Sequence, residues 1–389
     1  MNLPPGLADR PLYLDHNGTT PVDPRVVEAM LPSLQREFGN PSSSHAYGHA
    51  ARAAIEHARG QVSDLIGGHR GRIVFTGSGS EADALALKGA VLTHRRPGPR
   101  PHVITQATEH PAVLAACADL TELHDVDVTV LPVDQHGLVD PQAVAAAITD
   151  ATVLVSVMHA NNETGTIQPI ADITRVAHAR GVLVHTDSAQ SVGKIPVDAE
   201  VLGVDLLTVV GHKMYAPKGV AALWVRDGVT LRPITGGGGQ EAGLRAGTEN
   251  VPHIVALGQA AHLAGLALDA GETGRLTNLR DQLHRALDRS LPGRVHLNGH
   301  PTRRLPNTLN VSIDHTRALT LLERATGVAA SAGSACHAGH DAPSPVLTAM
   351  GLDPVRAMSA IRLSLGRWTT TADIERCAAL LAVAAAEGS

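Results

Sequence analysis

The sequence predicts an α/β protein with a large domain built on a mostly parallel sheet and a smaller C-terminal α/β domain. Up to about residue 255, short apolar runs typical of buried strands alternate with helical segments, which favours a parallel sheet covered on both faces. After that point a long helical stretch is followed by short strands mixed with helices. A chain of 389 residues is long enough for two domains. We expect a large domain over residues 16–255 and a small domain over residues 256–389, on which residues 1–15 pack.

Each predicted element follows from a local pattern. Apolar runs predict strands at Ile73–Phe75, His102–Thr105, Val128–Leu131, Thr152–Val157, Leu183–His185, Leu206–Val210 and Val220–Val225. Helical patterns occupy Ala50–Leu65, Glu81–Leu92, Pro111–Leu120, Pro141–Ile148, Ile170–Arg180 and, as one long stretch, Ile254–Leu291. The C-terminal part holds strands at Val295–Leu297, Thr308–Ser312 and Ile361–Leu365 and a last helix at Asp373–Ala386. Thr370 and Asp373 form a candidate capping pair for that helix.

Composition narrows the class of protein. A net charge of −5 and an ordinary balance of residues provide no electrostatic argument for binding nucleic acid or membranes. The N-terminus lacks the basic and apolar regions of a signal peptide, and no uninterrupted apolar run approaches the ~20 residues of a membrane span. Cys117, Cys336 and Cys377 form no C-x-x-C motif and no disulfide framework, so we expect a reducing compartment, the cytoplasm. Cys117 and Cys377, on Ala-rich helices, are expected to be buried.

An acid and a lysine close two neighbouring predicted strands. Asp187 ends the first strand and Lys213 follows the second, at the sheet edge where open α/β folds bind ligands. The pair suits pyridoxal phosphate, which needs a lysine for a Schiff base and an acid for its pyridinium nitrogen. A lone Asp is more often a turn residue and a lone Lys is usually solvated. With Gln190 and His212 nearby, the combination favours a cofactor site.

A second feature could hold the phosphate of such a cofactor. The turn Gly77–Ser80 lies between a predicted strand and a predicted helix, so backbone N–H groups and a positive helix end point toward an anion. Gly/Ser turns are common, and by itself this pattern is weak.

Cys336 lies in a run of small residues, Gly and Pro, S-A-G-S-A-C-H-A-G-H-D, which predicts an accessible loop. One interpretation is a metal site formed by Cys336, His337, His340 and Asp341, but it would need further partners. The favoured interpretation is a nucleophilic thiolate beside imidazoles, with no metal.

The chain resembles the cysteine desulfurase and selenocysteine lyase family, within the class V aminotransferase group. The motifs run in order through nearly the whole chain: Y-L-D-H-N-G-T-T-P, T-E-H, H-A-N-N-E-T-G, H-T-D-S-A-Q-S-V-G-K, G-H-K-M-Y-A-P-K-G, G-G-G-Q-E, R-A-G-T-E-N, L-P-N-T-L-N-V-S, S-A-G-S-A-C and I-R-L-S-L-G-R. The resemblance implies a fold-type-I pyridoxal-phosphate enzyme with a mostly parallel, seven-stranded type of sheet.

The resemblance also implies roles in holding the cofactor. Lys213 would form the Schiff base and move protons, Asp187 would pair with the pyridinium nitrogen, and Gln190 would hydrogen-bond the phenolic oxygen. His110, in T-E-H, would stack on the ring and act in catalysis. The implied phosphate ligands are Gly79, Ser80 and His212, with Thr248 from the neighbouring subunit of a homodimer.

Three further residues would handle the substrate. Asn162 and Arg362 would bind its carboxylate, and Cys336 would attack its sulfur or selenium. Without the resemblance, Asn162 could simply form a turn, Arg362 could lie on the solvent face of a strand, and His110 could merely start a helix.

The sequence departs from the family pattern in places. Ala84 replaces a polar residue, and Val210 stands where many desulfurases carry a serine, although selenocysteine lyases share the valine. We expect a cysteine desulfurase that converts L-cysteine to L-alanine and leaves a persulfide on Cys336; the alternative is a selenocysteine lyase acting on L-selenocysteine. An aminotransferase or C–S lyase that does not use Cys336, and a non-catalytic binding protein, are more distant alternatives. A sulfur acceptor protein is possible but unidentified, and the short C-terminus makes docking of a scaffold protein doubtful.

Overall fold

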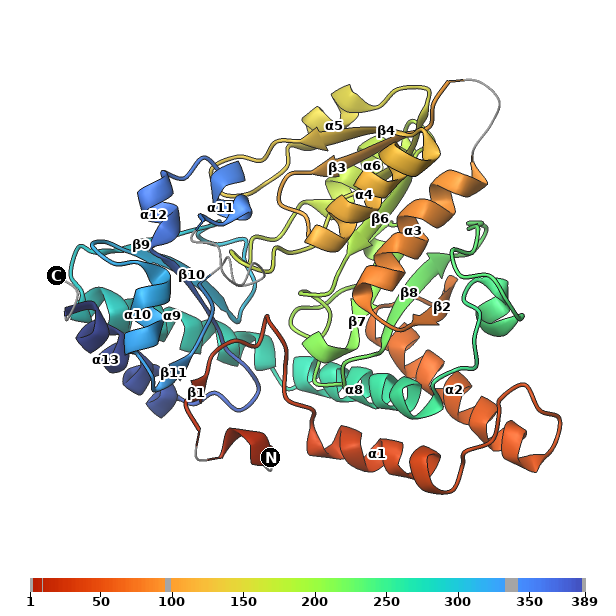
Figure 1. Cartoon of the computed structure of the whole chain (residues 1–389), viewed down its shortest axis with the longest axis horizontal. Helices are drawn as coiled ribbons and strands as arrows, with labels where there is room; N and C mark the ends of the chain where they lie inside the picture. Colours follow the sequence, from red (N-terminus) through yellow and green to blue (C-terminus); the bar gives the residue numbers. More distant parts are fainter. Residues whose placement is uncertain (1–2, 9, 95–98, 333–341, 387–389) are drawn as a thin grey trace.

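The centre of the molecule is a seven-stranded sheet, seen on the right of Figure 1. The computed structural model describes residues 3–8, 10–94, 99–332 and 342–386. From edge to edge the strands are β2 (Gly71–Thr76), β8 (Ala221–Arg226), β7 (Leu206–Val210), β6 (Leu183–Asp187), β5 (Thr152–Ser156), β3 (His102–Gln106) and β4 (Asp127–Leu131). β8 runs antiparallel to both of its neighbours, and the other pairs are parallel. The predicted strands of this sheet are therefore confirmed.

Helices cover both faces of the sheet. One face packs against α3 (Gly79–Thr93) and α4 (Pro111–His124). The other face packs against α2 (Ala46–Leu65), α5 (Pro141–Ala147), α6 (Ile170–His178), α7 (Ala199–Leu202) and α8 (Val251–Asp269). Strands β3 and β7 are buried at every residue. Strands buried on both faces do not show the alternation of apolar and polar residues that is typical of a half-exposed strand.

A second core lies on the left of Figure 1. Its three-stranded antiparallel sheet has the order β12 (Ala360–Ser364), β10 (Thr308–Ile313) and β9 (Val295–Leu297). Helices α9 (Glu272–Ser290), α10 (Ala318–Arg324) and α13 (Thr371–Ala386) pack on this core, and α11 (Pro345–Ala349) and α12 (Pro354–Met358) lie beside it. From the N-terminus, η1 (Pro5–Leu7) leads to β1 (Leu12–Tyr13), which pairs with β11 (Val328–Ala329).

The predicted helical stretch Ile254–Leu291 is two helices, α8 and α9. Gly271 separates them with a φ of 83°, a left-handed conformation that glycine adopts without strain. The buried side chains of α8 belong to the core of the large sheet, whereas those of α9 belong to the C-terminal core. The chain therefore passes from one core to the other at Ala270–Gly271, and residue 255, where the sequence suggested a boundary, lies inside α8.

By length and composition, α8 could also cross a membrane, and it is the one such helix in the part of the chain that the structure describes. Half of its apolar window is buried inside the protein. The buried side chains pack in the core beneath the sheet and against α1 (Pro24–Gln35), as in a core helix of a globular protein.

Side chains cap the ends of several helices. Thr370 and Asp373 cap α13 reciprocally: the Asp373 N–H donates to Thr370 Oγ1 at 3.2 Å, and the Thr370 N–H donates to Asp373 Oδ2 at 2.9 Å. The predicted capping pair is confirmed. Helix α1, which was not predicted from the sequence, begins after Asp23, whose Oδ1 accepts from the Arg25 N–H at 3.0 Å.

Candidate active site

The candidate site lies at the ends of β6 and β7. Asp187 is the last residue of β6 and is 6% exposed; its Oδ1 accepts from the Ala189 N–H at 2.9 Å. Burial raises the pKa of Asp187, although the charges of His110 and Lys213 act in the opposite direction. Lys213 ends the short helix η2 (Gly211–Lys213), directly after β7, and its Nζ donates to the carbonyl oxygens of Asn17 and Gly18, each at 2.7 Å. The structure therefore brings Asp187 and Lys213 into electrostatic contact.

His110 is both a helix start and a neighbour of this pair. It is the N-cap of α4, and its Nδ1 accepts from the Ala112 N–H at 3.1 Å. Burial lowers the pKa of His110, and Lys213 lowers it further while Asp187 opposes the shift. A neutral ring whose Nδ1 accepts carries its proton on Nε2. The two interpretations of His110 from the sequence are therefore compatible.

The predicted phosphate turn joins β2 to α3. Ser78 caps α3, with its Oγ accepting from the Glu81 N–H at 3.1 Å, and leaves the first N–H groups of the helix available to an anion. A Cβ on Gly79 would lie 2.6 Å from Val210 Cγ2, so only glycine allows this turn to approach the end of β7. The Ser80 side chain, also predicted to bind phosphate, is exposed.

His212 follows β7, as the predicted site requires. Its Nδ1 lies 3.1 Å from Thr19 Oγ1. Burial lowers the pKa of His212 to about 4, helped by Lys213, so the ring is neutral at neutral pH. In this state it can donate one hydrogen bond to an anion without bringing a positive charge.

Thr248 is exposed, in the loop between η3 (Gln240–Gly243) and α8. The η3 turn that precedes this loop is anchored within the chain by Glu241, whose carboxylate accepts from Arg59 at 2.9 and 3.0 Å and from the Phe75 N–H at 2.9 Å. Glu241 has a positive φ of 48°, so the ion pair holds a backbone conformation that a non-glycine residue rarely adopts. Among the described residues, Thr248 is not one of the groups that contribute to the electrostatics of Asp187 and His212 or accept from Lys213 Nζ.

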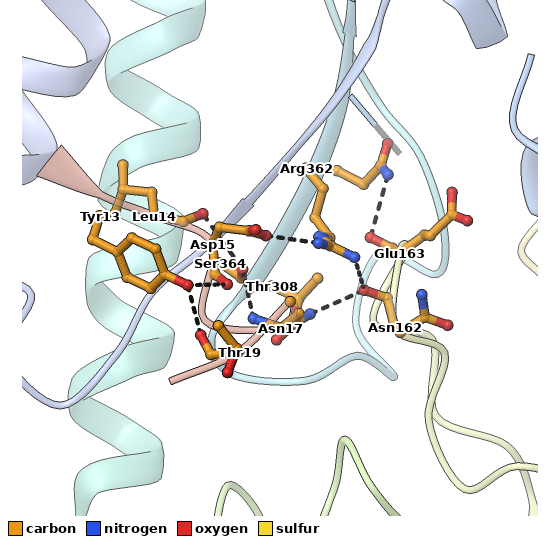
Figure 2. A network of polar contacts seen from close by, with 12 residues as sticks. Tyr13, Leu14, Asp15, Asn17, Thr19, Asn162, Glu163, Thr308, Arg362 and Ser364 are labelled. Atoms are coloured by element: carbon orange, nitrogen blue, oxygen red, sulfur yellow. Dashed lines mark hydrogen bonds and ion pairs between the residues drawn. The ribbon is translucent and has the colours of Figure 1, made fainter. Parts of the chain in front are cut away.

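Arg362 approaches the site from the C-terminal core. It lies on β12 and is 6% exposed, so the alternative of a solvent-facing arginine is wrong. Figure 2 shows its guanidinium between Asp15 and Asn162: Nη2 donates to Asp15 Oδ1 at 2.7 Å and Nη1 to the Asn162 carbonyl oxygen at 3.1 Å. The buried Nε has no hydrogen-bond partner in the described part of the chain. Arg362 therefore keeps one buried N–H donor that no described residue accepts.

Cys336 lies outside the described residues, but the described chain on both sides is anchored at the site. The Arg362 N–H donates to the Ser331 carbonyl oxygen at 2.7 Å. On the other side, Ser344 Oγ donates to Glu163 Oε2 at 2.5 Å, next to Asn162.

The other candidate metal ligands, His337, His340 and Asp341, also lie outside the described residues. Cys117 and Cys377 are buried as predicted, and burial raises the pKa of each thiol to about 12.

Several buried polar residues at the site were missed in the sequence. Glu109 is 3% exposed; its Oε1 accepts from the Met158 N–H at 2.6 Å, and burial raises its pKa to about 8. Burial also raises the pKa of Asp83, which interacts with Asp187. Asn17 and Lys194 make close contacts with Gln190. The available signals were motif positions: Asn17 lies in D-H-N-G-T-T, Lys194 in S-V-G-K and Glu109 in T-E-H, whereas Asp83 lies in none of the quoted motifs.

Comparison with known proteins identifies the family. A family model described as aminotransferase class-V matches residues 12–377. The chain belongs to this family. A cysteine desulfurase IscS of Methanosarcina thermophila is 45% identical over 371 residues, which are 95% of this chain and 90% of that protein. Among solved structures, a NifS-like protein superposes with a TM-score of 0.87 at 35% identity, covering 96% of this chain and 98% of the other. SspA in complex with cysteine superposes with a TM-score of 0.77 at 34% identity, covering 92% and 99%.

Membership of the class-V aminotransferase family confirms the predicted fold type and the predicted cofactor, since these enzymes depend on pyridoxal phosphate. The residues present suit that group. Asp187 is a buried acid, Lys213 supplies an amine, and Gly79 at the start of α3 approaches Val210 closely at the end of β7. Gln190 and His212 supply further polar side chains.

Proposed function

We propose that the protein is a pyridoxal-phosphate-dependent cysteine desulfurase that converts L-cysteine to L-alanine and leaves the sulfur as a persulfide on Cys336. The observation that supports this most strongly is the position of Arg362. Its buried guanidinium donates to the Asn162 carbonyl oxygen, which also accepts from Asn17, the residue whose own carbonyl oxygen accepts from Lys213. The described residues on both sides of the Cys336 segment are anchored next to it. The complex of the similar protein SspA with cysteine agrees with this substrate.

Each side chain at the site has a separate role in the proposed reaction. Arg362 binds the substrate carboxylate, and Lys213 Nζ takes the proton from Cα and later returns one. When bound, pyridoxal phosphate withdraws electrons from the substrate and so acidifies Cα. The Cys336 thiolate attacks the substrate sulfur: an S–S bond forms, the Cβ–S bond breaks, and the electron pair of the broken bond stays with the carbon. Uptake of a proton at that carbon completes alanine, so the thiol and cysteine are converted to a persulfide and alanine in balance.

A variant of the nucleophile tests this function. Cys336→Ala should keep the cofactor and its colour. It should form no persulfide, and it should release alanine from cysteine much more slowly than the parent. The measurements are alanine release and the mass of the peptide that contains residue 336, with Cys117→Ala as the control cysteine variant. Cysteine turnover that is unchanged in Cys336→Ala, with no extra sulfur on the parent peptide, would leave a simple lyase. Faster alanine release from selenocysteine than from cysteine, independent of Cys336, would favour the selenocysteine lyase alternative.

The assembly we propose is a homodimer in which Thr248 of one subunit reaches the cofactor phosphate of the other. Exposure of Thr248 on the loop that follows the η3 turn, which Glu241 anchors within the chain, supports this arrangement. Homodimers of Lys213→Ala and homodimers of Thr248→Val should each bind the cofactor or turn over cysteine poorly. A hybrid dimer of the two variants has one site with both Lys213 and Thr248 intact and should regain activity. A fully active monomer in sedimentation velocity experiments would contradict the proposal. We also propose a cytoplasmic location and transfer of the persulfide sulfur to an acceptor protein.

A further inference from the structure

A buried lysine lies beside the site and has no acidic partner among the described residues. Lys194 is 8% exposed, and no ion pair in the described part of the chain includes it. Its Nζ instead donates to two amide oxygens, Gln190 Oε1 at 2.6 Å and Asn17 Oδ1 at 3.3 Å. Burying an amine without a carboxylate is costly, and burial together with Lys213 and Arg362 lowers the pKa of Lys194. Such a costly arrangement calls for an explanation beyond packing.

The contacts of Gln190 define which way its amide faces. Both atoms that lie near Lys194 Nζ are oxygens, so the lysine is the hydrogen-bond donor to each. On the opposite side, Gln190 Nε2 donates to the Asn17 carbonyl oxygen at 3.0 Å. The same carbonyl oxygen accepts from Lys213 Nζ at 2.7 Å. The N–H groups of Gln190 therefore lie on the side of Lys213, and its oxygen lies on the side of Lys194.

Asn17 is held by the same lysine. Asn17 Oδ1 accepts from Lys194 and, at 3.0 Å, from Asn307 Nδ2. Its own Nδ2 donates to Thr308 Oγ1 at 2.8 Å and to the Asn162 carbonyl oxygen at 3.1 Å, the contacts drawn in Figure 2. Because each amide group is satisfied on both of its ends, neither side chain can turn over without losing buried hydrogen bonds.

We propose that Lys194 is a positioning residue that holds the amide of Gln190 with its N–H donors facing the phenolic oxygen of pyridoxal phosphate. The proposal rests on the bound cofactor and on the contact between Gln190 and the phenolic oxygen that the family resemblance implies. Without Lys194, Gln190 Oε1 is a buried acceptor without a donor, and the side chain is released to turn. A turned amide would present an oxygen to the phenolic oxygen. The N–H donor stabilises the ionised form of that oxygen, so losing it raises the pH at which the bound cofactor changes its absorption.

The test is a pH titration of the cofactor absorption in purified holoenzymes. Lys194→Met removes the donor and keeps the shape, Gln190→Leu removes the amide, and a third protein carries both changes. Lys88→Met is the control, because Lys88 Nζ is 2.6 Å from Asp119 in an ion pair outside the site. We expect the midpoint to rise by about 0.5 to 1 pH unit in Lys194→Met and in Gln190→Leu, and no further in the double variant.

Two results would overturn the proposal: a midpoint like that of the parent in Lys194→Met, or shifts that add in the double variant. Lys194→Gln provides an independent check, since its amide retains a donor at this position. Its midpoint should lie closer to the parent than that of Lys194→Met, and an equal shift in both would exclude donation as the cause. Alanine release by the parent is measured separately. A parent that binds the cofactor but releases no alanine would contradict the desulfurase function, while the titrations would still decide the role of Lys194.

Discussion

The guanidinium of Arg362 and the carboxylate of Asp15 form an ion pair of 2.7 Å that joins the C-terminal core to the segment just after β1 (Figure 2). The Arg362 side chain is 8% exposed and that of Asp15 is 30% exposed, so the acid faces the solvent side of the pair. Asp15 holds the guanidinium plane in place, and the buried Nε has no hydrogen-bond partner among the described residues. In the carboxylate-binding role proposed for Arg362, this orientation before the substrate arrives reduces the ordering cost of binding.

Replacing this arginine should affect substrate binding more than folding. Arg362→Lys keeps the charge but cannot hold Asp15, the Asn162 carbonyl and a carboxylate with one planar group. We expect kcat/KM for cysteine to fall about 10- to 100-fold, the loss of one charge-assisted hydrogen bond. Steady-state kinetics of Arg362→Lys and of the control Arg356→Lys, whose guanidinium binds the Leu297 carbonyl, provide the comparison. An equal fall in both variants would contradict the assigned role.

The lysine that binds the cofactor can be identified chemically. Borohydride reduction of the holoenzyme should attach the cofactor to Lys213, and mass spectrometry of the peptides should locate it there. Lys194 and Lys218 are the neighbouring lysines that provide the test of selectivity, since both influence the same histidine, His212. A label on either of them, or a Lys213→Ala protein that is still labelled, would show that the assignment is wrong.

Glu109 should make stability depend on pH. Burial raises its pKa to about 8 in the folded protein, above the ordinary value of 4.5, so the folded state holds a proton that the unfolded state has lost between these two values. Stability contributed by this group is therefore present below pH 4.5 and is lost as the pH rises to 8, by up to about 1.4 kcal/mol per pH unit. Glu109→Gln keeps an oxygen for the Met158 N–H but cannot ionise.

Urea unfolding of the cofactor-free proteins at pH 5, 6.5 and 8 measures this contribution. The free energy of unfolding of Glu109→Gln, relative to the parent, should increase with pH across this range. A constant difference between the two proteins would mean that Glu109 is ionised in the folded state.

A buried ion pair joins the start of α1 to the segment that follows β12. Arg367 Nη1 lies 2.6 Å from Asp23 Oδ2, with both side chains almost fully buried, and the guanidinium also lies over the Tyr215 ring. Arg367→Met should cost about 3 kcal/mol or more, because it leaves a buried carboxylate with one partner fewer. Arg25 is the other partner of the same carboxylate, and the Arg25 side chain is 45% exposed. Arg25→Ala should therefore cost less than about 1 kcal/mol. Equal losses in chemical denaturation would contradict this ranking.

The arrangement of the site was predictable where it depends on chain order and strand direction. Parallel strands end at a common edge, so Asp187 and Lys213, each placed at a strand end by its apolar run, had to lie close together. The order of strand, Gly-rich turn and helix in the sequence likewise predicted the Gly77–Ser80 turn at the start of α3. Motif similarity added His110 and Arg362, whose positions beside this edge no periodicity could have indicated.

Tertiary structure decided the features that depend on contacts between distant segments. An apolar run does not record strand direction, so β8 joined the predicted sheet but its antiparallel orientation came from pairing with β2 and β7. The solvent-face alternative for Arg362 failed because the N-terminal segment covers β12. Lys194 shows the limit most clearly. A lysine in a sequence is expected to be solvated, and only the tertiary structure brings the amide oxygens of residues 17 and 190 to Lys194 and so allows it to be buried.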